Sequence, residues 1–288
     1  MTTMEVNALG GTIVGNLLTA LCFGVLSIQI YSYYCAFPND TRLLKLVVAF
    51  LWTLEAFQLV CGTQSLYWWV GANYGNRLAS GDGTWGFTTF QISAVCASVT
   101  VQTFFSYRVY SLSANLYLGA FVQVFVLVQF GFGVVTSVKA NTVRKPVVAA
   151  EEIMWVAVSW LATQAIADIV ISTCMCILLR RRRTGFQKTD SVINRMVLYT
   201  INTGLATSVL SCVVLVLSVK HWTYFSITLG MLLGAFYSVT MLTNLHTRTT
   251  LRARLDMPTP LELIDFNQIE NAAGCGRLWK CRDSRLQK

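Results

Sequence analysis

Long blocks of apolar residues, separated by short polar segments, dominate the chain. A helix needs about 20 apolar residues to cross the hydrocarbon core of a bilayer. Blocks of about this length lie at residues 10–34, 44–70, 85–110, 116–138, 153–179, 192–219 and 222–246. A membrane β-barrel would instead show segments of about ten residues with alternating polarity. The pattern therefore predicts an all-α fold, an integral membrane bundle of seven transmembrane helices.

The composition agrees with a membrane environment. Hydrophobic residues make up 55% of the chain and charged residues only 12%, whereas about 25% of the residues are charged in ordinary soluble domains. A chain with so few charges cannot cover its own surface with them. We therefore expect the lipid bilayer to be its main partner. Its expected location is a membrane, either the plasma membrane or an internal one.

The basic residues are distributed unequally between the two sides of the predicted bundle. When successive loops are assigned alternately to the two sides, 17 Lys and Arg residues fall on the side of the C-terminal tail and 5 on the other. Basic residues close to spanning helices are retained in the cytosol. We therefore expect a short outside tail at 1–9, the transmembrane domain at 10–246 and a basic cytosolic tail at 247–288. A capping-box pattern in this tail predicts a short amphipathic helix at about 260–271.

The longest basic run follows the fifth block directly. It comprises Arg180, Arg181, Arg182 and Arg183, and Lys188 follows a few residues later. Such a run at the cytosolic end of a spanning helix stops translocation and attracts anionic lipid head groups. We expect these five residues to contact head groups, and the 180–195 loop and the tail to offer a surface to a cytosolic partner. No basic stripe is interleaved with aromatic residues, so nucleic acid is not an expected partner.

Three stretches resemble one known family. The longest is TGFQKTDSVINRMVLYTINTGLATS at 184–208, and the shorter ones are VQTFFSYRVYSLS at 101–113 and NYG at 73–75. They are similar to a fungal, mainly basidiomycete, family of seven-transmembrane proteins known as domain of unknown function 6534. The named domain covers mainly the last three helices, and the wider similarity runs from about residue 8 to 255. The resemblance implies seven helices and a fungal source, and it brings no activity, ligand or catalytic residue.

Residue types that carry chemistry are sparse. The two histidines, His221 and His246, lie near opposite ends of the seventh block. They would be about 37 Å apart along a helix, too far to share a metal ion. The chain contains no GxSxG, HExxH or P-loop motif. We therefore expect no metal site, no cofactor and no enzymatic activity.

Six of the polar residues inside the predicted spans, where polar groups are costly, are candidates for a polar cavity. They are Glu55, Gln58, Gln102, Gln164, Asp168 and Asn202. Residues three or four apart are neighbours on a helix, so each carboxyl shares its helix face with one of the glutamines. No Lys or Arg lies at mid-depth to pair with either carboxyl. One interpretation is a shared polar cavity that binds a ligand or a proton. The other is hydrogen bonding between helices.

Small residues recur four apart on two predicted helices. Gly11 and Gly15 lie in the first block, and Gly230, Gly234 and Ser238 repeat the spacing in the seventh. Such faces let helices approach closely. We expect them to pack within one bundle, with dimerisation as the alternative.

The favoured function is receptor-like or ligand-sensing, because the basic loop and tail offer a surface to a cytosolic partner. A small-molecule or proton-linked transporter is the alternative. Prolines within the spans and inverted repeats would favour a transporter, and the sequence shows neither. A non-catalytic bundle that organises lipid or partner helices is a third possibility.

Overall fold

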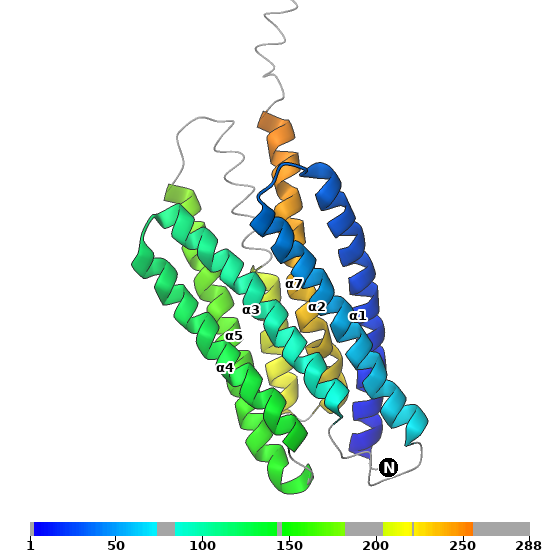
Figure 1. Ribbon diagram of the computed structural model, residues 1–288. Helices are drawn as coiled ribbons and strands as arrows, with labels where there is room; N and C mark the ends of the chain where they lie inside the picture. Colours follow the sequence, from blue (N-terminus) through cyan, green and yellow to red (C-terminus); the bar gives the residue numbers. More distant parts are fainter. Residues whose placement is uncertain (1–2, 74–83, 143–145, 182–203, 221, 256–288) are drawn as a thin grey trace, which may run out of the picture. The chain divides into compact units, whose positions relative to one another are not determined.

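The computed structural model describes residues 3–73, 84–142, 146–181, 204–220 and 222–255. These residues form seven helices, which confirms the all-α prediction for this part of the chain. The helices are α1 (Thr3–Ala36), α2 (Arg42–Leu66) with its π-helical continuation η1 (Tyr67–Ala72), α3 (Trp85–Ser113), α4 (Leu116–Thr142), α5 (Pro146–Arg181), the helix Gly204–Val219 and α7 (Thr223–Leu255) (Figure 1).

Five of these helices are long and apolar enough to cross a membrane. The spans are Val6–Ala36, Arg42–Ala72, Leu116–Ala140, Met154–Arg181 and Tyr224–Thr247. The chain is therefore a multi-pass membrane protein in contact with lipid. The helix α3 does not belong to this set, because serine, threonine and glutamine dilute its apolar character. The helix Gly204–Val219 is apolar but shorter, and the first residues of the predicted block 192–219 lie outside the described residues.

The described residues divide into two units. The first runs from Met1 to Thr247 and the second from Arg248 to Lys288. In the second unit, the described residues Arg248–Leu255 are helical as the last part of α7. The predicted amphipathic helix at 260–271 lies outside the described residues.

Side chains in the first unit are distributed in the opposite sense to those of a soluble protein. Apolar side chains such as Leu21 and Ile28 are about two-thirds exposed on the outside, at 68% and 69%. By contrast, Glu55, Gln58 and Gln102 are almost completely buried. Lipid solvates apolar side chains as well as a protein core does, whereas polar groups at membrane depth need partners inside the bundle. The hydrogen bonds between buried polar side chains therefore determine how the helices are arranged.

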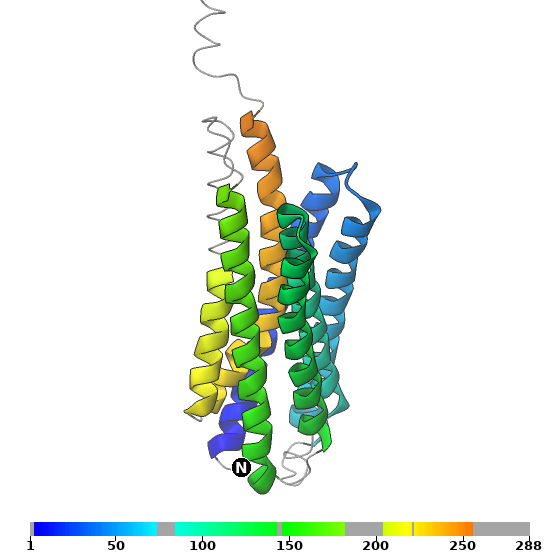
Figure 2. The same ribbon diagram turned by 90° about the vertical axis from the view of Figure 1, so that its left-hand side faces the viewer.

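The helix α7 is the most enclosed of the five apolar spans. Half of its most apolar stretch is buried, compared with 22–39% in the other four. Its side chains form hydrogen bonds with α1, α2, α3 and α5 (Figure 1, Figure 2). The pairs are Thr228 with the Gly11 carbonyl, Ser238 with Glu55, Asn244 with Arg108 and Tyr237 with Asp168. Contacts made by α7 therefore hold the bundle together.

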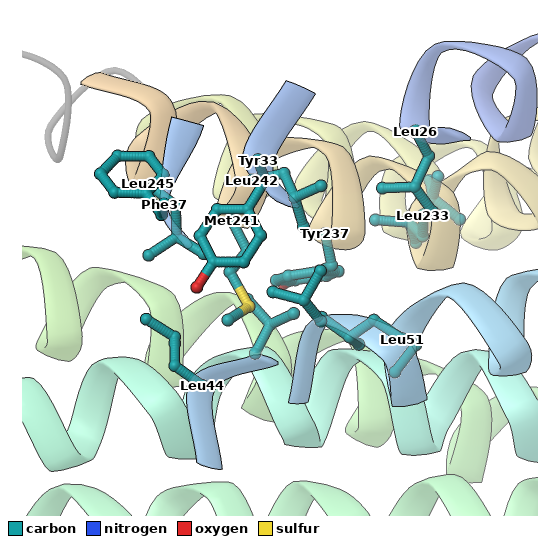
Figure 3. Packing of buried hydrophobic residues seen from close by; sticks show 14 of the residues in the cluster. Leu26, Tyr33, Phe37, Leu44, Leu51, Leu233, Tyr237, Met241, Leu242 and Leu245 are labelled. Carbon is teal, nitrogen blue, oxygen red and sulfur yellow. The ribbon is translucent and has the colours of Figure 1, made fainter. Parts of the chain in front are cut away.

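The main apolar core lies where α7 meets α1 and α2. Figure 3 shows side chains of this cluster from all three helices, among them Tyr33 of α1, Leu51 of α2 and Met241 of α7. The cluster also includes Leu242, next to Met241, and Leu245, one turn further along α7. All five side chains are fully buried. Close packing here provides dispersion contacts, which stabilise a bundle in lipid more than apolar burial does.

Two glycines of α1 let this helix approach α7 closely. A methyl group on Gly11 would lie 2.5 Å from the Tyr224 carbonyl oxygen, and one on Gly15 would lie 2.9 Å from Met231 Sδ. On α7 itself, a methyl group on Gly234 would lie 3.1 Å from Ala94 of α3. The small-residue faces predicted from the sequence thus pack inside the bundle.

We predict that Gly11→Ala and Gly15→Ala destabilise the protein. The Tyr224 carbonyl belongs to the backbone and cannot move aside, and overpacking typically costs about 1–3 kcal/mol. The measurement is the thermal unfolding midpoint of the purified protein in detergent.

Gly24→Ala and Gly131→Ala are the matched controls, because a methyl group at either position meets nothing within 4 Å. These variants should leave the midpoint unchanged or raise it, since alanine favours a helix by roughly 0.5–1 kcal/mol over glycine. An equal loss of stability in all four variants would show that α1 and α7 are not in close contact.

Candidate functional site

Asp168 lies near the middle of the span Met154–Arg181 and is buried. Gln102 of α3 donates from Nε2 to Asp168 Oδ1 at 2.8 Å, and the Tyr237 hydroxyl of α7 donates to Oδ2. Thr207, in the helix Gly204–Val219, lines the same small cavity as this carboxyl. Side chains from four helices therefore converge at Asp168. In the described part of the chain, its partners are neutral donors rather than Lys or Arg.

Glu55 lies at a similar depth in the span Arg42–Ala72 and has no exposed surface. The Ser238 hydroxyl of α7 donates to Glu55 Oε1 at 2.7 Å. Glu55 Oε2 and both polar atoms of Gln58 are buried without a hydrogen-bond partner among the described residues. Unsatisfied buried polar atoms are costly. This cluster is therefore a second polar site, on the side of α7 that faces α2.

Consecutive residues of α7 hold the two carboxyls. Tyr237 binds Asp168 and Ser238 binds Glu55. Neighbouring residues on an α-helix point about 100° apart, so the two side chains leave α7 toward different neighbours. Of the two interpretations drawn from the sequence, a shared cavity and hydrogen bonding between helices, the first would place both carboxyls together. In the structure Asp168 and Glu55 bind different residues of α7.

A small cavity adjoins Asp168. Its volume is about 30 Å³, and its polar lining includes Gln102, Ser172, Thr207 and Tyr237. One or two water-sized groups fit into such a volume. Glu55 does not line it. Gln102, which lines the cavity, has a buried Oε1 without a hydrogen-bond partner in the described part of the chain.

The other predicted site residues are placed as follows. Gln164 is buried on α5 one turn before Asp168, where it neighbours the Tyr237 hydroxyl. Asn202 lies outside the described residues. Arg180 and Arg181 are exposed in the last turn of α5. Arg182, Arg183 and Lys188 also lie outside the described residues.

The sequence interpretation missed three residues beside the carboxyls: Thr207, Tyr237 and Ser238. Serine, threonine and tyrosine are frequent in apolar helices, so none of the three stood out as a candidate. A usable signal did exist, because the Tyr237–Ser238 pair lies at the middle of the span Tyr224–Thr247. A buried tyrosine hydroxyl needs a hydrogen-bond partner, which at this depth points to a carboxyl or an amide.

A second group of polar contacts lies further along α7. Arg108 of α3 donates from Nη1 to Asn244 Oδ1 at 2.9 Å. His246 Nε2 donates to the Gln29 carbonyl of α1 at 2.7 Å. Asn244 and His246 are about two turns beyond Tyr237. The same helix therefore connects the mid-depth carboxyls with the ends of α1 and α3.

Metal-binding residues do not cluster in the described ranges. No group of three or more His, Cys, Asp or Glu side chains there could hold a metal ion. The Asp168 site has one carboxylate surrounded by neutral hydrogen-bonding groups. This arrangement can bind a small polar group or carry a proton.

One family model matches a part of the chain that includes some residues of this site. Residues 164–250 match a family described as a family of unknown function (DUF6534). The match covers Asp168, Tyr237 and Ser238, and it leaves out Glu55 and Gln102. No curated protein matches the chain. The chain thus contains a domain of unknown function that begins within α5 and continues into α7.

We predict that Tyr237→Phe destabilises the protein by about 1–2 kcal/mol. The substitution keeps the ring and removes one donor from the buried Asp168 carboxyl, and leaving such a group short of a partner has a cost of this order. Unfolding in detergent, followed by circular dichroism, measures the effect.

Tyr34→Phe is the control, because the Tyr34 hydroxyl donates to the Lys45 carbonyl at an exposed position. Its effect should stay within about 0.5 kcal/mol. The Asp168 bond would contribute nothing to stability if the two variants unfolded alike.

Proposed function

We propose that this chain is a non-catalytic, receptor-like protein with seven spans that senses a ligand at Asp168. The observation that carries the proposal is the position of α7. Its consecutive residues Tyr237 and Ser238 bind both deep carboxyls, and its residues Asn244 and His246 bind α3 and α1. A change at one carboxyl therefore reaches the end of the bundle through one continuous helix.

The proposed transmission is mechanical. A ligand in the cavity competes with Tyr237 for the oxygens of Asp168. A closely packed interior does not deform continuously but changes between discrete arrangements. A helix inside it therefore moves as a rigid unit. Asn244 lies about 10 Å along the helix from Tyr237 by the helical rise. A small rotation or shift of α7 at Tyr237 would therefore alter the bonds to Arg108 and Gln29.

Two other functions remain open to test. A transporter typically has broken helices whose ends face its midplane site, whereas α7 runs continuously past both carboxyls. A purely structural bundle would use the same hydrogen bonds only for cohesion. In that case a change at Asp168 would stay local. How far a perturbation travels along α7 therefore distinguishes sensing from cohesion.

The test perturbs Tyr237 and follows hydrogen exchange in lipid nanodiscs. In Tyr237→Phe, we expect faster exchange in peptides that contain Asn244, His246 and Arg108, in addition to peptides around Asp168. Gln129→Met is the matched control. It removes a buried bond between α4 and α3, from Gln129 Nε2 to Ser98 Oγ, and should affect only those two helices.

Exchange that changes only around Asp168 would reject the receptor-like proposal in favour of a structural bundle. The transporter alternative has its own readout. Proteoliposomes that enclose a pH-sensitive dye should show no proton flux through this protein when a pH gradient is imposed. A flux that Asp168→Asn abolishes would replace sensing by proton-linked transport.

We propose that the N-terminus lies outside, with the end of α5 and the C-terminal tail in the cytosol. The support is the excess of basic residues on that side, 17 against 5, since basic loops are retained in the cytosol. Arg180 and Arg181 are exposed there and would contact anionic head groups.

We predict that a glycosylation sequon inserted at residues 139–152 is modified in a eukaryotic expression host. A sequon in the distal tail should remain unmodified, because glycosylation occurs on the outside. Asn39→Gln removes the natural Asn-Asp-Thr sequon and gives a clean background. The opposite labelling pattern would reverse the proposed orientation.

A further inference from the structure

A large apolar groove runs along the outside of the bundle. It lies between α5 and the helix Gly204–Val219 and has a volume of about 780 Å³. Its apolar lining includes Ile169, Ile177, Leu205 and Val209, and each of these side chains is about half exposed. Exposed apolar side chains face lipid in this protein. The groove is therefore open to the hydrocarbon of the bilayer.

The groove meets the Asp168 cavity. Ser172 of α5 and Gly204 line both of them. Gly204 has no side chain, and a methyl group there would overlap Ser172 Oγ. These two small residues therefore form a thin wall between the lipid-facing groove and the buried carboxyl.

The chemistry on the inner side of this wall favours a hydrogen-bond donor. The oxygens of Asp168 accept from Gln102 and Tyr237, whereas a carboxylate has about four acceptor positions. Gln102 Oε1 is a second acceptor, buried and without a partner among the described residues. A donor in the cavity would satisfy both acceptors. The volume of about 30 Å³ limits it to one or two water-sized groups.

We propose that the ligand is a membrane-dissolved amphiphile with a long apolar chain and a small, donating head such as a hydroxyl. The chain lies in the groove between α5 and the helix Gly204–Val219. The head displaces the Ser172 hydroxyl, which lies against Gly204, and reaches Asp168 and Gln102. This inference rests on the proposed sensing function and adds the chemical class of the ligand and its route, which is lateral, from the bilayer.

Other occupants fit the observations less well. A phospholipid head group is far larger than the cavity. A carboxylate head would meet Asp168 with like charge and would bring no donor. Water alone would satisfy the acceptors, but it gives no role to an apolar groove that ends at the same two residues. Water therefore serves as the competing outcome of the test.

The test uses two photoreactive probes in nanodiscs that contain the full chain. One is a sixteen-carbon alcohol with a diazirine in the middle of its chain, and the other is its methyl ether. The two share the apolar chain, and only the alcohol donates a hydrogen bond. Labelling is read by mass spectrometry in peptides of α5 and the helix Gly204–Val219. Peptides of α4 around Phe121 and Val124, two exposed apolar residues, provide the reference for general lipid contact.

We expect the alcohol to label the groove about tenfold more than the ether, which corresponds to one hydrogen bond. Gly204→Val should reduce this preference to about one, because the added side chain closes the wall. Val213→Leu is the matched control, since Val213 lines the groove and not the cavity. Ser172→Leu closes the same wall from α5 and replaces Gly204→Val if that variant does not fold.

Equal labelling by alcohol and ether in the wild type would overturn the proposal and leave water in the cavity. A tenfold preference that both wall variants retain would overturn the lateral route. These failures are separable from failure of the sensing function, which is decided by hydrogen exchange in Tyr237→Phe without any ligand. If Tyr237→Phe shows the expected faster exchange in distant peptides and the two probes label equally, the protein is a sensor for a different class of ligand.

Discussion

Hydrocarbon offers no hydrogen bonds, and this constraint determines how the bundle is organised. Each polar atom at membrane depth must find a partner on a neighbouring helix or remain costly. The helix α7 supplies donors to Asp168 on one side and Glu55 on another. The apolar contacts around Tyr33, Leu51 and Met241 then pack the helices that these bonds bring together. Hydrogen bonds between polar side chains determine which helices lie side by side, and the apolar side chains then pack closely between them.

The sequence predicts the helices well because the bilayer imposes their length. The blocks 85–110 and 116–138 correspond closely to α3 and α4. The sequence also identified Glu55 and Asp168 as deep polar residues, because a carboxyl in an apolar block is conspicuous. Both facts follow from local composition, which requires no knowledge of neighbouring helices.

The partners could not be predicted in the same way. Pairing depends on rotation of each helix about its axis, and uniformly apolar helices such as α5 give little indication of which face points inward. Tyr237 and Ser238 are adjacent in sequence and yet serve different carboxyls. A shared cavity was a reasonable expectation from depth alone. The angle between consecutive residues on α7 separates the two sites.

The order of synthesis gives the central position of α7 a consequence for biogenesis. Chains are made from the N-terminus, and the earlier helices enter the membrane first. Gln102 can meet Asp168 as soon as α5 is inserted, but the donors of Tyr237 and Ser238 arrive only with α7. Until then Glu55 lacks the donor of Ser238 and Asp168 lacks that of Tyr237, so both carboxyl sites reach their final hydrogen bonding only when α7 is in place.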